Sequence, residues 1–315
     1  MATQTTTTSG LSATMQSYYD RKMLEWAKTQ FVFANYAQKR SIPKNNGKTV
    51  QFRRWTLFTA DPTTQALTEG TTPTAQNLSM SAITATVKQY GAYVEVSDLL
   101  DLTAIDNVIS DSSELLGEQL GNVLDMIVRD AMSATTNIQY AGGQASDDTI
   151  TATQKLTVEE IRKAVRTLKK AKARKFTRKG GKPHYICIVD PDAVYDLQSD
   201  SLWQDVSKYS NAEQIYDGEL GKMFGVVFIE TTNAKIVNNG SSYGVHQSFV
   251  FGSDSYGVVD VAGQGAIKAI VKPHGSSGTA DPLDQRATVG AKVTAFAACV
   301  LNSDWLVSIH HGVTA

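Results

Sequence analysis

The chain contains little that could crosslink it or hold it in a membrane. Its 315 residues include two cysteines, Cys187 and Cys299, each inside an apolar run. Two are too few for a disulfide framework or a four-cysteine zinc site, so we expect buried, unreactive thiols and folding in a reducing cytoplasm. The most apolar run, residues 293–301, is far shorter than the roughly 20 residues that span a bilayer. The polar first ten residues do not have the pattern of a signal peptide.

An excess of charge of either sign is also absent. Thirty lysines and arginines balance 31 aspartates and glutamates, for a net charge of −1. This balance argues against a dedicated nucleic-acid-binding protein, which usually carries a clear basic excess. One segment, residues 162–182, nevertheless holds many cations and no acid. In one interpretation this segment is a solvated face. In the other it binds DNA phosphates or an acidic patch on a partner, and the candidate residues are Lys169, Lys170, Lys172, Arg174 and Lys175.

No motif for catalysis, a cofactor or a metal is found. Gly47-Lys48-Thr49 resembles the end of a phosphate-binding loop, but Ile42 occupies the position of the required first glycine, and a strand is expected to follow. None of the five histidines lies four residues from another with an acid between them. We therefore expect no catalytic, cofactor-binding or metal-binding residues. A hydrolase with a scattered catalytic set remains an alternative without a supporting motif.

The N-terminal segment, up to Lys48, reads as an arm that has little core of its own. Its start, positions 1–12, is polar, and a helical pattern dense in aromatic residues runs from position 13 to about 39. We expect this arm to pack on something else, such as a neighbouring subunit.

Two strands, residues 48–59 and 83–97, flank a polar segment rich in Thr, Pro and Gly. Their apolar alternation changes face near Arg53-Arg54 and near Lys88-Gln89, which requires a bulge or a bend in each strand. The pattern predicts a long hairpin that projects from the body. We expect four of its apolar side chains to bury against an adjacent subunit: Trp55, Leu57, Ile83 and Val87.

Helices and further strands follow the hairpin. Thr103 to Asp106 resembles a capping box for a helix that reaches about Ala134, and Thr157 to Glu160 is a capping box for a second helix. The first helix is expected to bury one apolar stripe, made of Ile105, Ile109, Leu116, Leu120, Val123, Ile127 and Ala131. Residues 185–189 form a buried strand, and Asp190-Pro191 opens a short helix to about Gln198.

The chain ends in two alternating stretches, residues 288–301 and 305–310, which predict strands of a final hairpin. Strands and helices do not alternate regularly along the chain, so the fold class is α+β.

Several segments resemble one family in their order and spacing. The most specific begins at Ile83-Thr84-Ala85-Thr86-Val87 and continues through Gln89-Tyr90-Gly91. Leu67-Thr68-Glu69-Gly70, Gly221-Lys222-Met223-Phe224-Gly225 and Asp304-Trp305-Leu306-Val307 also match. Together these segments resemble the major capsid proteins of tailed bacteriophages, whose fold is shared with encapsulins. The resemblance covers residues 15 to 312.

The resemblance implies a coat-protein architecture. It assigns residues 1–48 to an N-terminal arm, 49–97 to an extended E-loop hairpin with Glu69 at its tip, and 98–190 to a peripheral domain with a long spine helix. Residues 191–275 would form an axial domain, and 276–315 would return to the peripheral domain. The spine helix is either 104–134 or 157–176.

The implied function is structural. Hexamers and pentamers of the chain would close into an icosahedral head that encloses double-stranded DNA without sequence specificity, assembled in the host cytoplasm and found in the virion. No long scaffolding segment precedes the arm, so we expect a separate scaffolding protein, with a portal and decoration proteins as further partners. The alternative within the same fold is an encapsulin-like shell that packages a protein.

Overall fold

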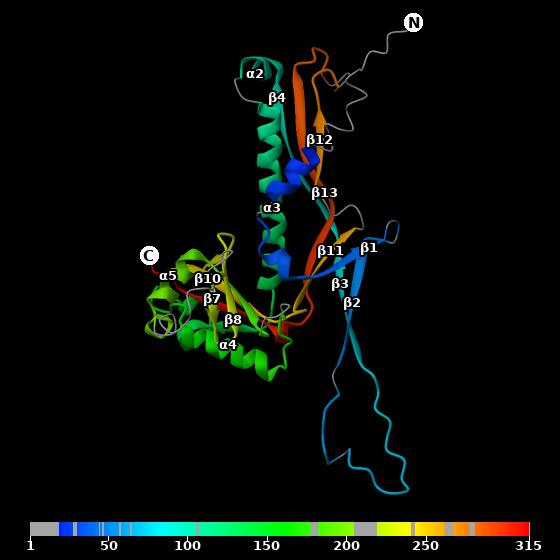
Figure 1. The fold of residues 1–315 in the computed structure, drawn as a ribbon, viewed down its shortest axis with the longest axis vertical. Helices are drawn as coiled ribbons and strands as arrows, with labels where there is room; N and C mark the ends of the chain where they lie inside the picture. The colour runs from blue at the N-terminus through cyan, green and yellow to red at the C-terminus, as the bar shows by residue number, and fades with distance from the viewer. Residues whose placement is uncertain are drawn as a thin grey trace.

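The computed structural model describes residues 19–27, 30–43, 45, 47–56, 58–63, 65–104, 107–177, 182–204, 219–240, 243–261, 267–276 and 281–314; for 219–222 and 261 it describes the backbone only. Helices and sheets are both prominent in the elongated molecule, which confirms the α+β class (Figure 1). Among the described helices, none is long and apolar enough to cross a membrane.

The first sheet is built around one long strand. Its order is β1-β11-β13-β12, with β4 also paired to β13, and its members are β1 Gln38–Ile42, β4 Lys88–Ser97, β11 Tyr256–Val261, β12 Lys268–Lys272 and β13 Arg286–Val300. Alternate residues of β13, such as Val289, Ala291 and Val293, are buried, as the two-residue period of a strand requires. Helix α3, Val108–Ser133, packs along this sheet (Figure 1).

The start of the long helix differs from the prediction. Helix α3 begins at Val108, where the Asn107 side chain accepts a hydrogen bond from the Ser110 N–H. A separate short helix, α2 Asp98–Thr103, precedes it, capped by Ser97. The capping box predicted at Thr103 is therefore wrong: Thr103 is the last residue of α2.

The buried face of α3 is also rotated from the predicted stripe. Leu116 and Leu120 are buried as expected, but beyond them Leu124 and Val128 are buried while Val123 and Ile127 are half-buried. The periodicity was ambiguous because α3 is covered on two sides, by the sheet and by the N-terminal segment.

The N-terminal segment packs on its own subunit. Residues 19–27 are helical, followed by the short turn η1 Phe33–Tyr36 and by β1, so the helix predicted to reach Lys39 ends earlier. Met23 and Ala27 are fully buried against α3. The expectation that the arm lacks a core within its own subunit is wrong for these residues; residues 1–18 lie outside the described part.

The second sheet has the order β5-β14-β10-β6-β8-β7, with β9 paired to β10. Its members are β5 Ile138–Tyr140, β6 Tyr185–Val189, β7 Glu219–Met223, β8 Val226–Glu230, β9 Lys235–Asn238, β10 Gly244–Phe251 and β14 Leu306–His311. Helices α4 Val158–Lys170 and α5 Pro191–Ser199 pack on it, and short turns lie at η2 Ala141–Gly143, η3 Asp147–Thr149 and η6 Ser303–Trp305. The sequence-based predictions of α4, β6 and α5 are confirmed.

The two sheets divide the chain differently from the expected boundaries. Strands β13 and β14 belong to different sheets, so the final hairpin predicted from residues 288–310 is wrong. Helix α4 lies in one apolar core with β6 and α5, across the expected boundary at 190. Strands β11 and β12, expected in the axial segment 191–275, pair with β13 in the first sheet. Each sheet combines segments far apart in the chain, which local patterns do not reveal.

Candidate functional site

A two-stranded hairpin projects from the body, opposite the end where α2 lies (Figure 1). Its strands are β2 Thr49–Trp55 and β3 Met80–Thr86, paired antiparallel from Thr49 with Thr86 to Trp55 with Met80. One more hydrogen bond, from Thr56 N to Ser79 O, closes the ladder. Residues 58–78 therefore extend beyond the last backbone contact between the two strands.

The tip of this hairpin is exposed throughout. Every described residue from 56 to 79 is exposed except Asp61, which is half-buried. Asp61 holds a local turn, accepting hydrogen bonds from the backbone N–H and the hydroxyl of Thr63. Large apolar side chains are exposed as well: Leu67 to 76%, Leu78 to 69%, and Phe58 to about half. Because solvation of such side chains is unfavourable, the tip has the character of a surface that another molecule covers.

The base of the hairpin, by contrast, belongs to the subunit's own core. Phe52 and Ala85 are buried in a cluster with Ile42 of β1 and Val259 of β11. The Phe52 ring lies over Gly257, where a Cβ atom would approach a ring carbon to 2.9 Å. A larger residue at position 257 would displace the Phe52 ring, so glycine there lets the hairpin base pack closely on β11.

The structure separates the residues predicted for an intersubunit contact. Trp55 is 59% exposed and Glu69 is exposed at the tip, whereas Ile83 is half-buried. Val87 is half-buried and packs against the cluster around Phe52 in its own subunit, and its contact with a neighbour stays a prediction. Leu57 lies outside the described residues.

Of the two predicted bends, one is present. The ladder between β2 and β3 is unbroken across Arg53-Arg54, so the bulge expected there is wrong; Trp55 simply points away from the face that Phe52 buries. The second is confirmed: β3 ends at Thr86, β4 begins at Lys88, and the register of β4 on β13 shifts between Val293 and Phe296. The hairpin thus bends away from the first sheet at Val87.

A basic groove of about 440 Å³ lies where the hairpin base meets the second sheet. Five cations line it, together with the acid Asp254: Arg40, Arg53, Arg54, Lys172 and Arg174. Among the described residues these cations make one ion pair, between Arg174 Nη1 and Asp254 Oδ2 at 3.9 Å. The guanidinium groups of Arg54 and Arg174 both lie within 6 Å of the Trp305 ring centroid, at 5.9 and 5.8 Å. The aromatic ring keeps these cations in place without neutralising them.

The predicted basic patch is divided between surfaces. Lys172 and Arg174 line this groove, and the backbone of Lys172 adopts φ 51°, in the left-handed region that ends helix α4. Lys169 and Lys170 instead flank a separate hollow next to Arg162 and Arg166, and Lys175 lies over the Tyr185 ring.

Sequence reasoning missed the three arginines of the groove. Arg53-Arg54 was visible as a charged pair inside a strand, but its proximity to Lys172 depends on the fold. Arg40 is brought in by β1, which pairs with β11, a strand from the far end of the chain.

Comparison with protein families gives one match. A family model described as phage capsid protein matches residues 127–285, just over half of the chain. No curated protein matches the sequence.

Solved structures with a similar fold are numerous. The chain resembles the capsid of Ralstonia phage GP4 with a TM-score of 0.70 and 15% identity, covering 91% of both chains. It resembles the Cyanophage Pam1 capsid with a TM-score of 0.66 and 14% identity, covering 89% of this chain and 92% of that one. A virus-like particle from Pyrococcus furiosus gives a TM-score of 0.53 and 12% identity, covering 94% of this chain and 99% of that one. At these identities the likeness concerns the fold.

Proposed function

This chain belongs to the phage capsid protein family, and from that premise we propose that its copies assemble as hexamers and pentamers into the icosahedral head of a tailed phage. The protein is a major capsid protein, and its role is structural and not enzymatic. This role replaces the hydrolase considered as an alternative from the sequence. The head would enclose double-stranded DNA, be assembled in the host cytoplasm and form part of the virion. A separate scaffolding protein, a portal and decoration proteins are the further partners we propose.

The observation that carries this proposal is the exposed hairpin tip. Phe58, Leu67 and Leu78 have large exposed side chains, and the tip contributes no residue to a described core cluster. Burial of one such side chain is worth about 2 kcal/mol. A neighbouring copy that covers three of them would gain about 6 kcal/mol before the entropic cost of ordering the tip is subtracted.

The same reasoning assigns the parts of the subunit. The proposed E-loop is β2, the tip and β3. The proposed peripheral domain is the first sheet with α3, which we take as the spine helix because it is the longest described helix and packs along β13. The proposed axial domain is the second sheet with α4 and α5, so its segments run from about 138 to 251 and from 306 to 314.

The test shortens the hairpin without touching its base. Residues 58–78 are replaced by a short Gly-Ser linker, which leaves the β2–β3 ladder and Phe52 in place. We expect a subunit that unfolds cooperatively like the wild type but no longer forms closed shells, measured by sedimentation velocity and negative-stain microscopy. As a matched control, a variant with Thr71→Ser and Thr72→Ser changes the tip but keeps Phe58, Leu67 and Leu78, and should assemble normally.

Two results would contradict the proposal. Loss of folding in the shortened variant would place the tip in the subunit's own core. Normal shells from the shortened variant would show that assembly does not need the tip. The encapsulin-like alternative is distinguished by the contents of purified particles, which we expect to be nuclease-protected DNA in place of a protein cargo.

A further inference from the structure

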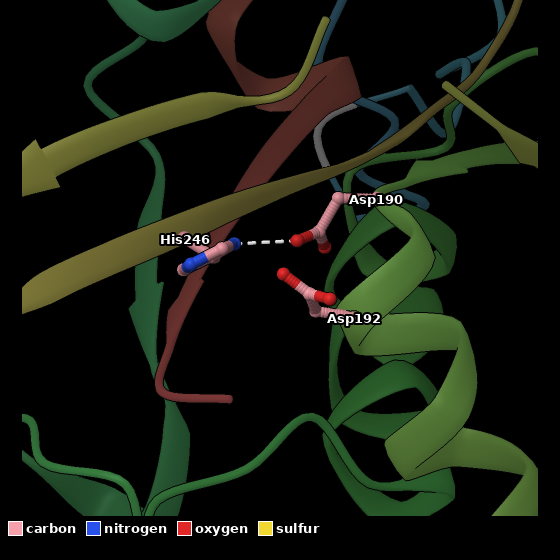
Figure 2. A group of neighbouring side chains, drawn as sticks. All are labelled: Asp190, Asp192 and His246. Carbon is pink, nitrogen blue, oxygen red and sulfur yellow. Dashed lines mark hydrogen bonds and ion pairs between the residues drawn. The ribbon is translucent and has the colours of Figure 1, made fainter. Parts of the chain in front are cut away.

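Three side chains converge at the end of the second sheet, away from the hairpin. Asp190 directly follows β6, Asp192 lies in the first turn of α5, and His246 lies in β10 (Figure 2). One carboxylate oxygen of each aspartate and one ring nitrogen of the histidine all lie within 4.8 Å of one another. The sequence predicted no metal site here, because Asp190-Pro191 reads as a helix start and His246 lies on a strand much later in the chain.

Asp190 is oriented for something other than capping its helix. It occupies the N-cap position of α5, where an aspartate normally accepts a hydrogen bond from a backbone N–H of the first turn. Its side chain makes no such bond. The carboxylate turns instead toward His246, whose Nδ1 contacts Asp190 Oδ2 (Figure 2).

The other oxygen of this carboxylate is buried without a partner. Asp190 is 4% exposed and His246 is 7% exposed. Asp190 Oδ1 has no hydrogen-bond partner among the described residues, although a buried carboxylate oxygen is normally satisfied. In Figure 2 it points to the side where the Asp192 carboxylate lies. An unpaired buried acceptor that faces a second carboxylate is unfavourable unless a cation lies between the two.

Few groups offset the negative charge of the two carboxylates. Within the described part of the chain, Asp192 forms no ion pair, and the side-chain partner of Asp190 is His246. His311, whose ring is 6.2 Å from that of His246, is already engaged: its Nδ1 donates to Gly312 O and its Nε2 accepts from Ser248.

The chemistry of the three groups selects the class of ion. Ca²⁺ and Mg²⁺ prefer sites made of oxygen alone, whereas an imidazole nitrogen beside carboxylates suits Zn²⁺ and Mn²⁺. Ligands on opposite sides of such an ion are about 4.2 Å apart at bond lengths of about 2.1 Å. Because His246 Nδ1 and Asp190 Oδ2 are in direct contact, an ion bound by both replaces the proton between them and moves the two groups slightly apart, while the exposed Asp192 side chain moves inward.

We propose that Asp190, Asp192 and His246 bind a divalent transition-metal ion, Zn²⁺ or Mn²⁺, that ties the start of α5 to β10. His246 coordinates through Nδ1 in its neutral form, so the proton that Nδ1 shares with Asp190 moves to Nε2 or is released to solvent. Water completes the coordination sphere on the exposed side. The bound ion links a helix and a strand that are well separated in the chain.

The test uses the purified full chain after treatment with a chelator and dialysis. Titration calorimetry with ZnCl₂ and with MnCl₂ should show one ion per chain for at least one of the metals, and that metal should raise the melting temperature. Asp192→Asn should weaken binding at least tenfold and abolish the rise in melting temperature. This variant should keep its fold because Asp192 is exposed. MgCl₂ is the ion control.

Glu159→Gln is the matched protein control, since Glu159 is an exposed acid in the first turn of α4, the position that Asp192 has in α5. It should bind the metal like the wild type. Absence of binding to the wild type by both metals would overturn the proposal and leave Asp190 and His246 as a buried hydrogen-bonded pair. Equal binding by Asp192→Asn and the wild type would also overturn it, by placing the ion elsewhere. Both outcomes are independent of shell assembly.

Discussion

At the scale of single residues, Asp125 is the most unusual charged group in the core. It lies on α3, fully buried, and accepts hydrogen bonds from the backbone N–H groups of Val32 and Ala34 at 3.1 and 3.2 Å. Its second oxygen has no partner among the described residues. Burial raises the pKa of Asp125 to about 6, although these hydrogen bonds and the nearby charge of Arg129 lower it.

This raised pKa predicts how stability depends on pH. Between pH 4 and pH 6 the folded protein retains a proton on Asp125 that the unfolded chain has released, so the free energy of unfolding falls as pH rises through this window. The loss is about 1–3 kcal/mol, at 1.36 kcal/mol per unit of pKa. Asp125→Asn keeps an acceptor for Val32 and Ala34 and should be more stable than the wild type by this amount at pH 7, but not at pH 4.

Urea denaturation of both proteins at the two pH values measures this difference. Asp130→Asn, on the same helix, is the control of opposite sign. Although burial raises the pKa of Asp130, hydrogen bonds from Lys235 and Arg129 lower it below its usual value. Asp130→Asn should therefore be less stable than the wild type at pH 7, and this difference should shrink at low pH. A gain from Asp125→Asn that is equal at both pH values would contradict the assignment.

At the scale of secondary-structure elements, two glycines of α3 determine how closely the helix of residues 19–27 packs. A Cβ atom at Gly117 would lie 2.7 Å from Met23 O, and one at Gly121 would lie 2.8 Å from Ala27 O. Both obstacles are backbone atoms, which cannot rotate away. The spacing of four places both glycines on one face of α3, so the two helices approach along a strip without side chains.

Gly121→Ala is therefore expected to destabilise the subunit. Alanine improves helix propensity by about 1 kcal/mol, but a forced shift of the packed helix costs about 1–3 kcal/mol. The net result should be a lower melting temperature, measured by circular dichroism. An increase in stability would show that the contact yields without cost. In a chain that lacks residues 1–30, the same substitution should stabilise the subunit, because the packed helix is absent and only the gain in helix propensity remains.

Sequence patterns predicted elements well where one local signal dominated. Thr157 with Glu160 located the start of α4, and the run at 185–189 identified β6. They failed where a helix is covered on two sides, as at Val123 and Ile127 of α3. They also failed where partners are distant, as for β13 and β14, because adjacency in the chain suggested a hairpin that the two sheets do not contain.

At the scale of the whole molecule, the basic groove and the exposed tip carry opposite charges. The tip contains Asp61 and Glu69 and no lysine or arginine, whereas the groove holds five cations and one acid. Attraction between the tip of one copy and the groove of another is therefore favourable, and a contact between unlike surfaces closes only when the copies form rings.

Charge removal in the two parts of the predicted patch should have different effects. Lys172→Gln with Arg174→Gln should weaken shell closure by about 1–2 kcal/mol per subunit contact, and the difference from the wild type should be larger at low salt, where these charges are least screened. Lys169→Gln with Lys170→Gln lies outside the groove and serves as the matched control for assembly of empty shells. Light scattering during assembly at low and high salt measures both. The whole predicted patch can also be neutralised, by changing these five residues to Gln: Lys169, Lys170, Lys172, Arg174 and Lys175. If that variant still forms heads and retains packaged DNA, the segment is a solvated face.

The position of the last two strands has a consequence for the timing of synthesis. Strand β13 holds β4, β11 and β12 together, and β14 lies between β5 and β10. Neither sheet can close until the ribosome has made residues 286–311. A nascent chain therefore cannot present its hairpin on a finished body before these last strands have been made.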